Sequence, residues 1–112
     1  MNLKEVEIDG IIILQLSGKV MGGPDANLLG EKLHELIDAK KTRVIADLAQ
    51  VSLMNSSGLG MLIGGLTTMR NNNGDLKLAN VTERIKSLLI ITKLISIFET
   101  YDSVQDAMKS YD

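Results

Sequence analysis

The sequence predicts a single α/β domain, residues 1–112, with the element order ββαβαβαβα and a mostly parallel mixed sheet packed against helices. Three observations support this fold class. The chain of 112 residues has the length of one domain. Short apolar runs alternate with segments in which apolar residues recur at helical spacing, a pattern typical of strand–helix units with right-handed crossovers. No linker, repeat or low-complexity segment divides the chain.

The first two strands are predicted to form a hairpin. Residues 6–8 and 11–16 flank Asp9-Gly10, a pair that tolerates the positive φ angles of a tight two-residue turn. The second run is almost continuously apolar, which is expected of a strand buried on both faces. Ser17-Gly18 is expected to end this strand. The first strand is then an antiparallel strand at the edge of the sheet.

The later elements are predicted from apolar spacing and from their end signals. Pro24 suits the first turn of a helix, since its missing N–H is no loss there. Ser103 with Asp106 resembles a capping box for a terminal helix. The predicted elements are a helix from Pro24 to the region of Ile37, a strand at 43–48, a helix carrying Leu59 to Met69, a strand at 76–79, a helix from Thr82, a last strand at 95–98 and a helix after Ser103.

Composition excludes several classes of function. Lys and Arg number 12 and Asp and Glu 14, so the net charge of −2 supplies no basic field for nucleic acid. Cysteine is absent and there is one His, which excludes disulfides, thiol catalysis and a metal cluster. We expect no metal and no cofactor.

Nothing in the sequence indicates a membrane segment or a secretory signal. The most apolar stretch, residues 88–98, is interrupted by Thr92, Lys93 and Ser96 and falls short of the ~20 residues that span a bilayer. The first residues turn acidic at once and lack a long apolar segment. We expect a cytoplasmic location without membrane contact.

The segment at residues 51–60 joins a strand to a helix, where α/β folds place functional loops. Asn55 or Ser56 can cap the helix, and the free N–H groups there favour an anion such as a phosphoserine. Glycines at positions 58, 60, 64 and 65 each cost about 1 kcal/mol in a helix and suggest close approach by another backbone or a partner. The alternative is that these residues only cap and pack.

Residues 54–62, preceded by 44–48, resemble the signature of the STAS family, which includes bacterial anti-sigma factor antagonists and the cytoplasmic domains of sulphate transporters. The resemblance extends over essentially the whole chain. It implies an antagonist whose first hydroxyl residue after the acidic position, here Ser56, is phosphorylated by an anti-sigma factor serine kinase with a histidine-kinase-like ATPase fold. A metal-dependent serine phosphatase usually reverses the modification. Two positions depart from the family, because Asn55 and Met21 stand where an Asp is usual.

The resemblance implies a partner-binding protein and not an enzyme. Unmodified, it binds the kinase and frees the sigma factor; phosphorylated on Ser56, it releases the kinase because a hydrated dianion is excluded from the interface. The predicted partner-binding residues are Met21, Gly22, Gly23, Asn55, Ser56, Ser57, Gly58 and Leu59.

Three alternatives remain at this point. The domain could be a phosphorylation-independent scaffold or a sensor of a nucleotide or lipid. A hydrolase using Ser17, Ser56 or Ser57 would need a base, and only His34 is on offer. We therefore expect no catalytic residue and place His34 on the surface.

Asp25 is expected to complement a helix dipole. Residues 88–95 carry more apolar surface than one helix face hides, so they form a partner or weak homodimer surface, or a helix buried on two sides.

Overall fold

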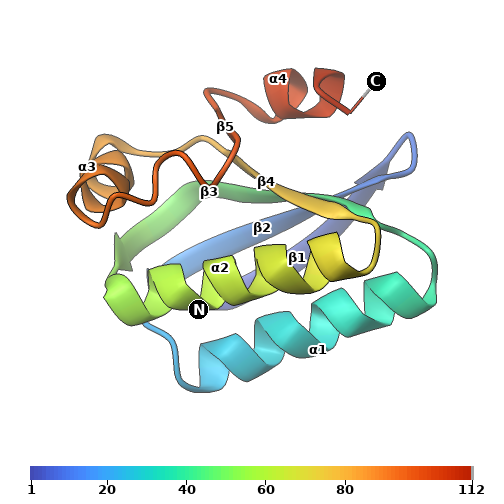
Figure 1. The fold of residues 1–112 in the computed structure, drawn as a ribbon, viewed down its shortest axis with the longest axis horizontal. Helices are drawn as coiled ribbons and strands as arrows, with labels where there is room; N and C mark the ends of the chain where they lie inside the picture. Colours follow the sequence, from blue (N-terminus) through green and yellow to red (C-terminus); the bar gives the residue numbers. More distant parts are fainter. Residues whose placement is uncertain (112) are drawn as a thin grey trace.

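The structure, a computed structural model, describes residues 1–111 and has the predicted element order (Figure 1). Its elements are β1 (Asn2–Ile8), β2 (Ile11–Val20), α1 (Pro24–Asp38), β3 (Arg43–Met54), α2 (Ser56–Asn71), β4 (Asp75–Ala79), α3 (Glu83–Ile91), β5 (Thr100–Tyr101) and α4 (Val104–Lys109). The five strands form one sheet in the order β1-β2-β3-β4-β5.

The predicted hairpin is confirmed. Strand β1 lies at the edge of the sheet and pairs antiparallel with β2, whereas the other strands pair in parallel. Asp9 and Gly10 have φ angles of 53° and 79°, the positive values that a two-residue turn between such strands requires. The turn places Ile8 opposite Ile11 and so sets the register of the whole pair.

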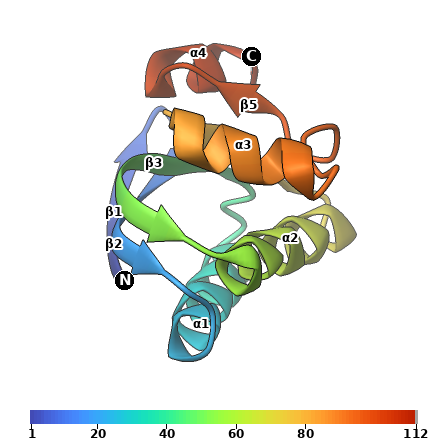
Figure 2. The same cartoon turned by 90° about the vertical axis from the view of Figure 1, so that its left-hand side faces the viewer.

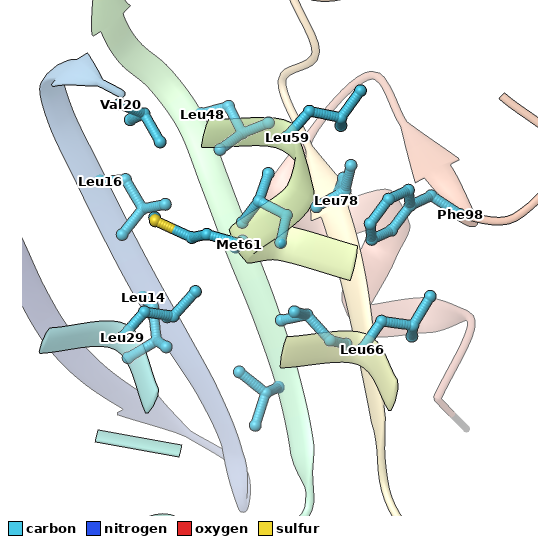
Figure 3. Packing of buried hydrophobic residues seen from close by; sticks show 14 of the residues in the cluster. Leu14, Leu16, Val20, Leu29, Leu48, Leu59, Met61, Leu66, Leu78 and Phe98 are labelled. Carbon is cyan, nitrogen blue, oxygen red and sulfur yellow. The ribbon is translucent and has the colours of Figure 1, made fainter. Parts of the chain in front are cut away.

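Helices lie on both faces of the sheet, and each face has its own apolar core. Figure 1 shows α1 and α2 on one side of the sheet and α4 on the other. The larger core is built by α1, α2, α3 and one sheet face, and its packing is drawn in Figure 3. The smaller core lies between α4 and the opposite face. Strand β2 belongs to both, since Ile12 and Leu14 enter the larger core and Ile11 and Ile13 the smaller one.

Strands β2 and β3 extend beyond the predicted ends. Strand β2 does not stop at Ser17-Gly18 but continues to Val20, with register shifts beside Ser17 and Gly18, and Gly18 has a φ of 81°. Strand β3 continues past Leu48 to Met54. The extra residues pair with each other, ending at Val20 opposite Met54. This pairing brings the ends of both strands to the start of α2.

The predicted last strand at 95–98 is wrong. Helix α3 ends at Ile91, the chain turns through Lys93 at a φ of 62°, and the last strand is the short β5. Only Phe98 of the apolar run is buried, while Ile95 and Ile97 are exposed. No helix within residues 1–111 combines the length and apolar character needed to cross a membrane.

Candidate functional site

The starts of α1 and α2 meet the ends of β2 and β3 on one side of the molecule (Figure 2). The N–H of Asn55 donates to the carbonyl oxygen of Val20 at 3.4 Å, which joins the two strand ends. A side chain at Gly22 would place its Cβ 3.0 Å from the Cβ of Ser57. The loop between β2 and α1 therefore lies directly against the first turn of α2.

Asn55 is the N-cap of α2. Its side-chain Oδ1 accepts a hydrogen bond from the N–H of Gly58 at 2.8 Å, and its carbonyl oxygen accepts one from the N–H of Leu59 at 3.0 Å. Ser56 is thus the first residue of the helix, and the N–H groups of Ser56 and Ser57 have no partner within the helix. The first turn of α2 carries no acidic side chain, so no carboxylate there offsets the positive end of the helix dipole.

The predicted partner-binding residues divide into exposed and buried groups. Met21, Gly23, Ser56 and Ser57 are exposed, and Asn55 is partly exposed. The buried members are Gly22, Gly58 and Leu59. The Leu59 side chain is 1% exposed and points into the larger core (Figure 3), so it packs beneath the exposed surface and forms no part of it.

Gly58 is required by close approach of two backbones. A Cβ at Gly58 would lie 1.9 Å from the carbonyl oxygen of Val20, a distance that no side-chain rotation can relieve. The predicted close approach is therefore confirmed at Gly58. At Gly65 the near neighbour is a side chain, with Leu33 Cδ1 2.9 Å from the added Cβ, whereas Gly60 and Gly64 face open space.

Two other polar residues considered from the sequence, Asp25 and His34, belong to helix α1 and not to the start of α2. Asp25 is in the first turn of α1, where the dipole role places it, and its carboxylate is 3.5 Å from the amino group of Met1. His34 is exposed on α1. Within residues 1–111, no three His, Asp or Glu side chains are grouped as metal ligands would be.

The connectivity, the strand order and the Asn-Ser-Ser start of α2 are together the arrangement of a STAS domain. The chain belongs to the STAS domain family, whose family model matches residues 2–107. Members of this family that are anti-sigma factor antagonists are regulatory binding proteins and not enzymes.

Similar proteins span nearly the whole chain. BtrV of Bordetella bronchiseptica, named as an anti-sigma factor antagonist, is 27% identical over 111 residues, which is 99% of this chain and 95% of BtrV. A Thermotoga maritima crystal structure with the same kind of name matches with a TM-score of 0.85 and 21% identity, covering 96% of this chain and 92% of that one.

The Bacillus protein SpoIIAA, named as an anti-sigma factor antagonist, has been solved both without and with its phosphoryl group. The unphosphorylated form matches with a TM-score of 0.72, covering 98% of this chain and 96% of its own. The phosphorylated form matches with a TM-score of 0.75, covering 99% and 100%. Both are 16% identical to this chain, so the likeness concerns the fold.

Proposed function

We propose that this protein is an anti-sigma factor antagonist that binds an anti-sigma factor serine kinase in a bacterial cytoplasm when Ser56 is unmodified. Phosphorylation of Ser56 by that kinase releases the complex, and a serine phosphatase restores binding. The observation that carries the proposal is the position of Ser56, an exposed first residue of α2 that directly follows the capping Asn55 in a STAS domain.

The surroundings of Ser56 favour a phosphoryl group. A phosphoserine carries about −1.5 to −2 charges at pH 7, and the start of a helix offers it free N–H groups and the positive dipole end. No acidic side chain in the first turn of α2 repels it. In SpoIIAA the same overall fold accompanies both the phosphorylated and the unphosphorylated form, which supports a switch that leaves the domain folded.

We expect release of the partner because the residues around Ser56 are mostly small. Gly22 and Gly23 place no side chain on their part of the neighbouring loop, so a partner can approach Ser56 closely there. The exposed Met21 side chain supplies adaptable apolar contact beside it. A dianion enclosed in such an interface loses its hydration, which costs several kcal/mol where the partner offers no counter-charge. Partner exclusion is thus sufficient, and no change of fold is needed.

Asn55 supplies the cap without the charge that is usual in the family. The amide oxygen of Asn55 holds the N–H of Gly58, as an Asp carboxylate at this position would. If a carboxylate also orients the serine hydroxyl toward the kinase, Asn55→Asp raises the phosphorylation rate. An unchanged rate assigns position 55 to capping alone.

The test uses the full chain, the anti-sigma factor kinase from the same host and ATP, with the modified peptide identified by mass spectrometry. We expect a phosphoryl group on Ser56, its loss in Ser56→Ala and its retention in Ser57→Ala, the neighbouring exposed hydroxyl as matched control. We also expect Ser56→Ala to bind the kinase as the parent does and Ser56→Asp to bind more weakly. Phosphorylation at another residue, or equal binding of both Ser56 variants, contradicts the proposal.

A further inference from the structure

The sheet face that carries α4 has a recess beyond the end of that helix. It has a volume of about 410 Å³ and is lined by residues of β1, β2 and β3. Its polar lining consists of Asn2, Lys4, Gln15, Ser17, Asp47 and Gln50. None of these residues belongs to the surface around Ser56, so the recess is a second feature of the molecule.

The recess lies where this sheet face changes from apolar to polar. One row across the strands, Val6, Ile13 and Ile45, packs under α4. The next row on the same face is Lys4, Gln15 and Asp47, since Lys4 is paired with Gln15 and Gln15 with Asp47. The polar row is thus not an unfilled part of the core but a surface that can bind a polar ligand.

The two charged groups of this row stand two strands apart with a carboxamide between them. Adjacent strands are about 4.8 Å apart, so the backbones at Lys4 and Asp47 are separated by about 10 Å. Within residues 1–111, Lys4 forms no salt bridge. Asp47 is held in place, because its Oδ1 accepts hydrogen bonds from Asn80 Nδ2 at 2.9 Å and from the N–H of Ala49 at 3.1 Å.

We propose that the recess binds a small zwitterion of the amino-acid class. Its carboxylate is bound by the Lys4 ammonium and its ammonium by the Asp47 carboxylate, with charge-assisted hydrogen bonds of about 2.8 Å at each end. Gln15, between the two, can both donate and accept. A ligand with only one charge can form charge-assisted hydrogen bonds with Lys4 or with Asp47 but not with both, so the row favours a ligand that carries both charges.

The test is a chemical-shift titration of the ¹⁵N-labelled full chain with matched small molecules. Alanine carries both charges, propionate only the carboxylate and propylamine only the ammonium; the other common amino acids complete the panel. We expect one or more amino acids to shift the amides of Gln15, Asp47 and Ala49 with a Kd of about 1 mM, and the singly charged compounds to bind at least about tenfold more weakly.

Two variants of the polar row and one control variant make the test specific. Lys4→Gln removes one charge from an exposed side chain and should weaken amino-acid binding about tenfold, whereas Lys93→Gln, a charge removal at an exposed position after α3, should leave it unchanged. Asp47→Asn, checked for folding by its spectrum, should weaken binding similarly. The proposal is overturned if no amino acid shifts these amides at about 10 mM. It is also overturned if propionate binds as well as alanine, or if Lys4→Gln binds as the parent does.

Discussion

At the scale of single residues, Gly58 allows the backbones of strand β2 and helix α2 to lie in close contact. An Ala Cβ at this position meets the Val20 carbonyl oxygen at 1.9 Å, so α2 and β2 have to separate. We expect Gly58→Ala to lower the free energy of unfolding by about 3 kcal/mol, at the upper end of overpacking effects. Urea unfolding followed by circular dichroism measures it.

Gly60→Ala is the matched control in the same helix. Position 60 faces open space, and Ala is favoured over Gly in a helix by up to about 1 kcal/mol. This variant should therefore be as stable as the parent or more stable. Equal unfolding midpoints for Gly58→Ala and Gly60→Ala would show that the contact with Val20 is not what requires glycine.

Asn55 is the second residue on which the site depends. Asn55→Ala removes the hydrogen bond to the Gly58 N–H and should cost about 1 kcal/mol of stability. Asn55→Asp retains an acceptor and adds a negative charge at the helix start, so it should match or exceed the parent at neutral pH. Thermal unfolding of the three proteins distinguishes these outcomes. An Asp variant as unstable as the Ala variant would contradict the capping role.

At the scale of elements, α4 is held on the sheet by polar groups at its C-terminal end. The Tyr111 hydroxyl donates to the Val44 carbonyl oxygen at 2.7 Å and accepts from the Val44 N–H at 3.2 Å. The buried Lys77 Nζ donates to Ser110 Oγ at 2.6 Å and lies 4.2 Å from the centre of the Tyr111 ring. These contacts attach a six-residue helix that has one fully buried side chain, Ala107.

The partly buried Tyr111 hydroxyl predicts that the folded protein loses stability at alkaline pH. Burial, with the Asp75 carboxylate as a further cause, raises the pKa of Tyr111 above its ordinary value of 10.0. The folded state therefore holds this proton more tightly than the unfolded state. The resulting stability is complete below about pH 10 and is lost as the pH rises through the folded pKa.

We expect the parent's free energy of unfolding to fall more steeply above about pH 10 than that of Tyr111→Phe. At neutral pH, Tyr111→Phe should be less stable by about 1–2 kcal/mol, because it leaves the Val44 groups without their partner. Urea unfolding at neutral and alkaline pH measures both effects. Parallel pH curves for the two proteins would mean that Tyr111 does not contribute through its proton.

The elements that the sequence predicted well are those with local end signals. Asn55, Thr82 and Ser103 each accept a hydrogen bond from the N–H three residues on, as N-caps do. The last strand lacked such a signal. Its two residues pair with Leu78 and Ala79, a long-range contact that the apolar run before it does not encode.

At the scale of the whole molecule, the reach of α4 over the sheet determines where polar residues appear on β2 and β3. Gln15, Ser17 and Gln50 interrupt the apolar pattern and resemble the end of a strand. They are polar because α4 leaves their part of the sheet face uncovered, and the strands continue beneath them. This arrangement becomes visible only once the helix is docked.

The candidate site could be predicted in outline for a different reason. The cap is a local consequence of a strand turning into a helix, so residues 54–58 predict it. The contact of Gly58 with Val20 joins two distant segments, and the glycine alone predicts only that some backbone or partner lies close. Leu59 satisfied two patterns, helical core spacing and proximity to Ser56, and the burial of its side chain assigns it to the core. The pairing of Gly22 with Ser57 joins distant segments, and only the resemblance indicated it.

The central claim is that phosphorylation of Ser56 excludes the kinase partner. The most direct measurement compares the Kd of the host's anti-sigma factor kinase for the unmodified chain and for the chain carrying phosphoserine at position 56. The account predicts binding at least about 100-fold weaker for the phosphorylated chain, equivalent to about 2.8 kcal/mol. Equal Kd values for the two forms would contradict it.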